Sequence, residues 1–117
     1  MGRIITQEKM DAMHAAIAAD KTALGPTLGV MLIKGNVPVE AAATLLAVSE
    51  PTIYRWMYGE ASPRDPDKIV KLKNFLMLLR RMRRDRDLPL EGTTAARVQN
   101  FVKLVKKHHV ARAQTPA

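Results

Sequence analysis

The chain has 117 residues, of which 47% are apolar, so it is long enough for one domain with a hydrophobic core. It contains no cysteine, which excludes disulfide bonds, thiolate metal sites and cysteine nucleophiles. No apolar run reaches the roughly 18 residues that a membrane-spanning helix needs. We therefore expect a protein of the cytoplasm that has no contact with a membrane.

The charge of the chain is large, positive and unevenly distributed. The formal net charge is +8, a sign and size that favour polyanionic partners. Residues 1–63 carry five basic and six acidic side chains, whereas residues 64–117 carry fourteen basic and five acidic ones. The second half must therefore supply most of the attraction for an anionic partner.

Residues 6–20 have the pattern of an amphipathic helix. Thr6 is a suitable N-cap, and Met10, Met13 and Ile17 recur at helical spacing. The following Leu24-Gly25-Pro26 stretch predicts a break in the chain.

Residues 27–34 form a short apolar run, TLGVMLIK, that fits either a buried strand or a buried helix. Nothing nearby offers a strand partner. We therefore favour a helix that begins at Thr27 and ends with Gly35 in the C-cap position.

Residues 38–59 predict two short helices joined by a tight turn. The first covers residues 38–47, with Pro38 tolerated in its first turn. Ser49 is a suitable N-cap for the second, and an acid and a proline follow it in the first turn. Ile53, Trp56 and Met57 face inward at helical spacing, and Gly59 ends this second helix.

Five residues stand at the positions that a perpendicular corner between two helices requires. Ala43 is small where the second helix crosses the first, and Ala47 occupies the turn position of unusual backbone angle. Val48 is an apolar plug, while Ile53 and Trp56 point inward from the second helix. The pattern predicts a helix-turn-helix, and the alternative is a pair of packed core helices that only resembles one.

The second half of the chain predicts two longer helices. The first covers residues 66–86, is capped by Asp65 or Asp67, and is apolar nearly all round its middle. Either helix 27–34 and the last helix both pack on it, or a second subunit does. After a break at residues 88–92, Thr93 or Thr94 begins a last helix that ends near residue 109, followed by a frayed tail. The expected inward residues of this last helix are Val98, Phe101, Val102 and Val105.

These elements predict an all-α, compact bundle of about five or six helices that contains the helix-turn-helix. Residues 1–25 would be an N-terminal helical extension, residues 26–87 the helix-turn-helix domain, and residues 88–117 a basic helix with a tail. We expect the three parts to form one compact unit.

Residues 42–63, AATLLAVSEPTIYRWMYGEASP, resemble the helix-turn-helix of Cro and lambda-repressor-like (XRE-type) regulators. The resemblance extends to residues 27–34 and 66–79, about half of the chain. Ala47 departs from the family pattern by replacing the usual turn glycine. Glu50 and Pro51 depart from it where the family often carries residues that reach DNA. The matching positions are Ala43, Leu46, Val48, Ser49, Thr52, Ile53, Arg55, Trp56, Gly59 and Pro63.

The resemblance implies that the second helix of the motif reads DNA in the major groove. Arg55 is the best base reader, because its guanidinium can grip the two acceptors of guanine. The alternatives are that Arg55 pairs with Glu50 or Asp65, and that Tyr54 and Tyr58 pack around Trp56. The candidate base-reading residues are Ser49, Glu50, Thr52, Tyr54, Arg55 and Tyr58.

Residues 36–59 have a net charge of −1, so the motif cannot supply the phosphate contacts that dominate affinity for DNA. We expect the basic side chains that follow it to do so. The alternative is a solvated surface, with the arginines near residue 84 also favoured by the helix dipole. The candidates are Arg64, Lys68, Lys71, Lys73, Arg80, Arg81, Arg83, Arg84, Lys103, Lys106 and Lys107.

The sequence thus predicts a phage or bacterial transcriptional regulator that binds double-stranded DNA as a homodimer in the host cytoplasm. One alternative is a DNA-packaging protein similar to small terminase subunits. Another is a helix-turn-helix module that binds a protein such as RNA polymerase. We expect no enzymatic activity, metal, cofactor or small-molecule ligand, because neighbouring His108 and His109 diverge on a helix and no catalytic or phosphate-loop motif occurs.

Overall fold

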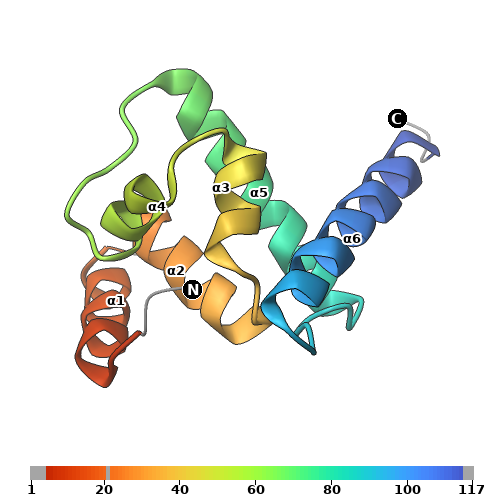
Figure 1. Cartoon of the computed structure of the whole chain (residues 1–117). Coiled ribbons are helices and arrows are strands. Elements are labelled where there is room, and N and C mark those ends of the chain that lie inside the picture. Colours follow the sequence, from red (N-terminus) through yellow and green to blue (C-terminus); the bar gives the residue numbers. More distant parts are fainter. Residues whose placement is uncertain (1–4, 21, 115–117) are drawn as a thin grey trace.

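The computed structural model describes residues 5–20 and 22–114, and side chains as far as His109. Within these ranges the chain forms six helices and no strand (Figure 1), which confirms the predicted all-α bundle. The radius of gyration is 14.0 Å, near the value of about 13 Å for a compact chain of this length. The helices are α1 (Gln7–Ala19), α2 (Leu24–Gly35), α3 (Val39–Leu46), α4 (Glu50–Met57), α5 (Pro66–Arg84) and α6 (Thr94–Gln114).

Three helices begin with the caps that the sequence predicts. The Thr6 side chain accepts a hydrogen bond from the backbone N–H of Lys9 at the start of α1. Ser49 accepts from Thr52 at the start of α4, and Asp65 accepts from Asp67 at the start of α5. Each bond satisfies one of the backbone donors that a helix leaves unpaired at its first turn.

The start of α2 differs from the prediction. The helix begins at Leu24, so Pro26 lies in its first turn, where the missing N–H removes no helical bond. The Thr27 hydroxyl donates to the carbonyl of Ala23 at 2.7 Å instead of capping a later helix. The expected boundary between an extension and a domain after residue 25 therefore falls inside α2.

Four helices, α2 to α5, end in the same left-handed turn. In each, a residue with positive φ follows the helix, and the next N–H donates to a carbonyl five residues back, as in a Schellman motif. The residues with positive φ are Asn36 (55°), Ala47 (56°), Gly59 (73°) and Arg86 (63°). The closing bonds run from Val37 to Leu32, Val48 to Ala43, Glu60 to Arg55 and Asp87 to Met82, at 2.8–3.1 Å.

These turns confirm one expected backbone position and correct another. Ala47 adopts the unusual backbone angle that was expected at the corner. Gly35, expected as the C-cap of α2, is instead the last helical residue, and Asn36 takes the left-handed position. Asn tolerates that conformation better than most residues. Gly35 is small because a Cβ there would approach the side chain of Leu88 to 3.0 Å.

The core lies around α2, on which α1, α4 and α5 pack, and α6 packs in turn on α5. Leu72, Leu76 and Leu79 of α5 are fully buried or nearly so. The ring of buried Phe101, on α6, lies edge-on to that of Phe75 at 6.0 Å. Helices of the same chain therefore cover much of α5. This agrees with the alternative in which the helix at residues 27–34 and the last helix both pack on it.

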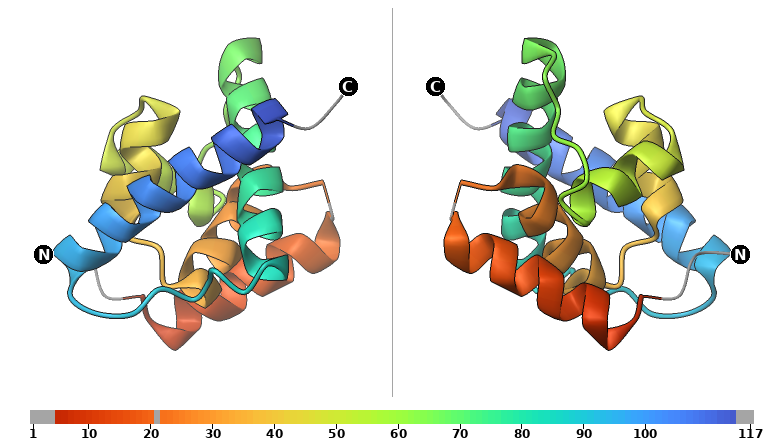
Figure 2. Two further views of the ribbon diagram at one scale, coloured as in Figure 1. Left: turned by 90° about the vertical axis from the view of Figure 1, so that its right-hand side faces the viewer. Right: turned by 90° about the vertical axis from the view of Figure 1, so that its left-hand side faces the viewer.

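Helix α6 crosses both α3 and α5 (Figure 2, left) and corrects two expectations. It continues to Gln114, beyond the end expected near residue 109. Val102, expected to point inward, is 42% exposed, whereas Leu104 is partly buried against the core. Val102 lies about 100° round the helix from Phe101, so the two cannot both face the core.

Candidate nucleic-acid interface

The corner between α3 and α4 is built from the small and apolar residues that the sequence places there. Ala43 and Trp56 are buried, Ile53 is fully buried and Val48 is half-buried. Residues 47–49 join the two helices, so α3 and α4 form the expected helix-turn-helix.

Lys68 stabilises this corner from outside it. Its Nζ donates to the carbonyl oxygens of Leu46 and Ala47, at 3.3 and 3.0 Å. These carbonyls lie at the C-terminal end of α3, where the helix dipole favours a cation. Lys68, expected on phosphate, is thus engaged by the protein itself, and we remove it from the candidate set.

The outer edge of α4 presents most of the expected base-reading residues. Ser49, Glu50 and Arg55 are exposed, while Thr52 and Tyr58 are half-buried. The hydroxyls of Ser49 and Thr52 lie 2.8 Å apart and hydrogen-bond to each other. The alternative in which Arg55 pairs with an acid is not observed, because the described side chains include no ion pair to it.

Tyr54 corrects the expected reading face. Its side chain is only 5% exposed, and its ring lies 6.0 Å from that of Tyr58, tilted by 34°. The N-terminal end of α1, which lies outside the motif, faces α4 here across a groove. Thr6 and Lys9 line the same groove, of about 440 Å³, as Tyr54 and Arg55. Tyr54 is therefore a packing residue and leaves the candidate set.

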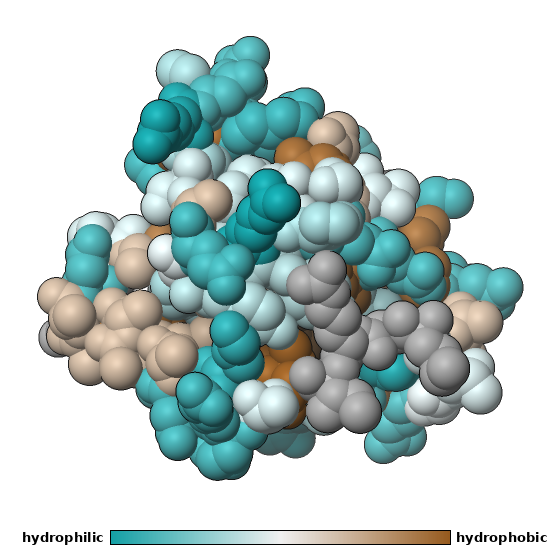
Figure 3. Space-filling view, turned by 60° about the vertical axis from the view of Figure 1, so that its left-hand side comes forward, coloured by the Kyte–Doolittle hydropathy of each residue, from teal (hydrophilic) through white to brown (hydrophobic). Residues whose placement is uncertain are grey.

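Lys9 is a cation beside α4 that sequence reasoning did not place there. Its Nζ lies 4.5 Å from the ring centroid of Tyr58 and 3.9 Å from a carboxylate oxygen of Glu60. No local pattern could have revealed this contact, because it joins segments about fifty residues apart. On the face turned forward in Figure 3, hydrophilic side chains alternate with pale, near-neutral areas and with some apolar ones.

The candidate phosphate-binding side chains occupy three separate places. Arg64, Lys71 and Lys73 are exposed near the start of α5, and the arginines cluster at its end. Lys73 of the first group and Arg80 of the second are seven residues apart, about 10 Å along the axis of α5. The second group, at the end of α5, consists of the exposed Arg80, Arg83 and Arg84 and the half-buried Arg81. The third group, on α6, consists of Lys103, Lys106 and Lys107, which are exposed.

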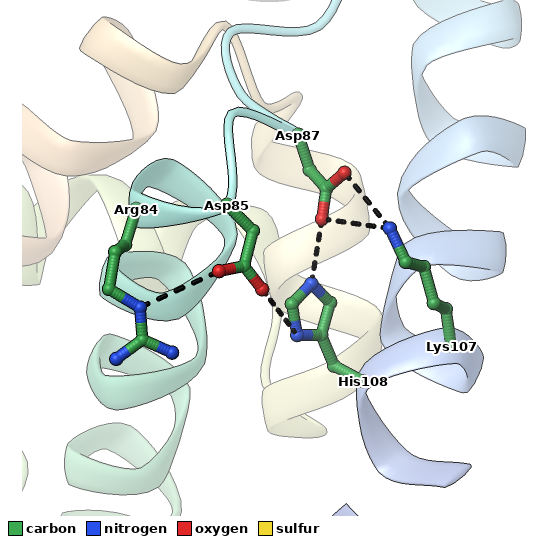
Figure 4. A network of polar contacts seen from close by, with 5 residues as sticks. All are labelled: Arg84, Asp85, Asp87, Lys107 and His108. Carbon is green, nitrogen blue, oxygen red and sulfur yellow. Dashed lines mark hydrogen bonds and ion pairs between the residues drawn. The ribbon is translucent and has the colours of Figure 1, made fainter. Parts of the chain in front are cut away.

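A polar cluster joins the end of α5 to α6 (Figure 4). His108 is 4% exposed, and its Nε2 lies 2.8 Å from a carboxylate oxygen of Asp87. Its Nδ1 lies 3.9 Å from Asp85, which also pairs with Arg84, while Lys107 pairs with Asp87 at 3.2 Å. The hydrogen bond from His108 lowers the pKa of Asp87, with help from Lys107 and against the effect of burial.

This cluster holds α6 against the residues that follow α5. One ligand atom each of Asp85, Asp87 and His108 lies within 4.8 Å of the others. The two carboxylates, however, face different ring nitrogens of His108, and a metal ion would take only one of those nitrogens. His109 points elsewhere and is exposed, as the predicted divergence of the two histidines requires.

A second polar contact, at the start of α6, was also missed by sequence reasoning. Arg97 donates to the backbone and side-chain oxygens of Asn36, at 3.0 and 2.8 Å. Asn36 in turn donates to the carbonyl of Leu90 at 2.9 Å. The end of α2, the connection before α6 and the first turn of α6 are thereby held together.

Comparison of the chain with models of protein families, with curated proteins and with solved structures yields no match in any of the three. The resemblance to Cro and lambda-repressor-like regulators therefore remains a prediction from the sequence. None of the described helices combines the length and the apolarity needed to cross a membrane.

Proposed function

We propose that this protein is a sequence-specific transcriptional regulator of a phage or bacterium that binds double-stranded DNA through α4. The observation that carries the proposal is the α3–α4 corner, with Ser49, Glu50 and Arg55 exposed along the outer edge of α4. A helix held in this way offers its first turns to base edges in the major groove. Arg55 would read guanine.

In this proposal, different residues select the DNA sequence and attract the DNA. The turn and α4 carry Glu50 and Arg55 as their charged residues, so they add almost no net charge. Two exposed cations near the start of α5, Arg64 and Lys73, follow in the chain and would contact the phosphates beside the major groove. Lys9 would add a further cation next to α4.

We further propose that two copies bind a near-palindromic site in the cytoplasm of the host. Paired recognition helices of this kind sit about one helical turn of DNA apart. A symmetric site recovered from random DNA would support the dimer. A closed ring of many chains, measured by mass, would instead favour the packaging role.

The test is a selection of bound sequences from random duplex DNA, followed by gel-shift titration of variants. Arg55→Ala should weaken binding to the selected sequence by about 10- to 100-fold and change binding to random DNA little. Lys34→Ala is the matched control, since Lys34 is an exposed cation on α2 beside Leu88 and Pro89. Equal effects of the two substitutions on the selected sequence would contradict the proposal.

A second candidate is a helix-turn-helix that binds a protein such as RNA polymerase. The exposed Glu50 and Pro51 at the start of α4 favour it, because an acid there repels phosphate. Failure to bind any duplex DNA at low salt would select this candidate over the first.

A further inference from the structure

A second groove lies between α3, α5 and α6, and no residue of α4 lines it. Its volume is about 290 Å³. Its apolar lining comes from all three helices, with the side chains Leu45, Leu46, Phe75, Leu78 and Val105. We call it the α3–α5–α6 groove; α6 crosses the other two helices there (Figure 2, left).

The polar lining of this groove is basic. Its polar lining residues are Lys71, Asn74, Arg81, His108 and His109, and none of its lining residues is an acid. The nearest carboxylates, Asp85 and Asp87, are engaged by His108, Arg84 and Lys107. The groove thus combines an apolar floor with two cations, Lys71 and Arg81, that take part in none of the ion pairs of the described side chains.

Exposed apolar side chains gather around the same groove. Among the described side chains, four large apolar ones are exposed: Leu45, Val70, Met77 and Val102. Leu45 lines the groove itself. Val102 lies about 60° round α6 from Val105, and Met77 lies about 60° round α5 from Asn74. Val70 is one turn before Asn74 on α5, so these exposed apolar side chains lie on the flanks of the helix faces that line the groove.

We propose that the α3–α5–α6 groove binds an acidic, amphipathic helix of another protein. Amphipathic helices bind apolar grooves through side chains spaced three or four residues apart. The rim of Lys71 and Arg81 favours an occupant with glutamates or aspartates beside its apolar face. This inference does not rest on the proposed binding of DNA.

The basic rim and the apolar floor of the groove favour an acidic amphipathic helix over two other occupants, which are a second copy of this chain and DNA. A symmetric contact with a second copy would place the same patch opposite itself, so that Lys71 and Arg81 would approach their own equivalents or each other. DNA would meet the cations but would leave Leu45, Leu78 and Val105 without an apolar partner. An acidic amphipathic helix satisfies both the charge and the floor.

The experiment titrates the full chain, labelled with nitrogen-15, with a synthetic 16-residue helical peptide. The peptide carries leucines on one face and glutamates on both flanks, and the comparison peptide carries lysines in place of the glutamates. We expect saturable shifts of the amide signals of Leu45, Leu78 and Arg81 with the acidic peptide, and at least about tenfold weaker binding of the basic one.

Two substitutions and one control localise the site. Leu45→Glu and Arg81→Glu should each weaken binding of the acidic peptide at least about tenfold, and both residues reach the surface, so the variants should fold. Lys34→Glu makes the same change of charge as Arg81→Glu on another side of the molecule and should leave binding unchanged.

Three outcomes would overturn the proposal. The first is the absence of saturable shifts at millimolar acidic peptide. The second is equal binding of the two peptides. The third is displacement of the acidic peptide from these residues by duplex DNA, which would make the groove a nucleic-acid surface.

Discussion

Gly25 and Gly29 stand one turn apart on α2, but they meet different neighbours. A Cβ on Gly25 would overlap the backbone carbonyl of Trp56, at the end of α4. A Cβ on Gly29 would lie 2.5 Å from the sulfur of Met13, which is the flexible end of a side chain. The backbone cannot move without moving α4, whereas the methionine can change rotamer.

Gly25→Ala should therefore lower the free energy of unfolding by about 3 kcal/mol, as an overpacked core position does. Gly29→Ala is the matched control. Its gain in helix propensity, about 1 kcal/mol, offsets much of the displacement of Met13, so the net change should stay below that of Gly25→Ala. Urea denaturation followed by circular dichroism measures both, and equal losses would contradict the assigned contact.

Ala47 holds a left-handed conformation that disfavours any residue with a Cβ. Ala47→Gly should stabilise the protein by about 1 kcal/mol, because glycine adopts this conformation without that penalty. Ala12→Gly, at an exposed position inside α1, should destabilise it by about the same amount. Thermal unfolding would reveal the opposite signs, and a loss of stability for Ala47→Gly would show that the alanine methyl contributes packing.

At the scale of elements, α6 is attached to the rest of the molecule at three points. Arg97 bonds to Asn36 near its start, Phe101 packs on Phe75, and His108 bonds to Asp87. Two of these points are polar and involve partners from outside α6. The bond between His108 and Asp87 involves a carboxylate, so this point of attachment should respond to pH.

The pKa of Asp87 lies below its ordinary value of 3.8, mainly because of the bond with His108. The unfolded chain then binds more protons than the folded chain in this range, so stability rises with pH there. The contribution of Asp87 is complete above roughly pH 5 and is lost as the pH falls through 3.8 toward the lower folded value.

Asp87→Asn should consequently be less stable than the parent by about 2 kcal/mol at pH 7, and the difference should shrink below about pH 4. Glu91→Gln, in the same connection but exposed and outside the ion pairs of the described side chains, should leave the pH profile unchanged. Denaturation at a series of pH values measures this, and a difference that stays constant with pH would contradict the assignment.

Local patterns predicted most of these elements, and distant contacts account for the errors. The caps Thr6, Ser49 and Asp65 bond within their own first turns, so the sequence reveals them. Pro26 was interpreted as a break because nothing local shows that it falls in a first turn.

The candidate site was predicted in outline by the same local rules. The corner and the exposed Arg55 follow from spacing on two short helices. Tyr54 is buried beside a groove that Thr6 and Lys9 also line, and the engagement of Lys68 depends on carbonyls about twenty residues earlier. Such contacts have no signature in a single stretch of sequence, and the same holds for His108 with Asp87.

At the scale of the whole molecule, positive charge is distributed over two ends of α5 and one face of α6. If DNA lies against α4, the start of α5 is the nearer end, because it follows α4 after a short connection. The far arginines then contribute through longer-range attraction, which salt screens over about 10 Å at 0.1 M.

Replacing Arg64 and Lys73 with glutamine should reduce the salt dependence of DNA binding more than replacing Arg80 and Arg83 does. Each lost phosphate contact lowers the slope of log K against log salt by about 0.9, so the first pair should change it by about two. Fluorescence anisotropy at several salt concentrations measures the slopes. A larger change for the arginine pair would place DNA on the other end of α5.

The connection between α3 and α4 has three residues, and each of its two end residues has a role that an insertion would disturb. Its first residue closes the turn of α3, and its last residue, Ser49, caps α4. One residue inserted after Ser49 would shift every later residue of α4 by one helical position, about 100°. Arg55 would then take the buried position of Trp56, and Tyr54 the exposed position of Arg55. Related chains should therefore vary in residue type between positions 47 and 49 while keeping their number, and insertions should instead occur in the connection between Gly59 and Asp65.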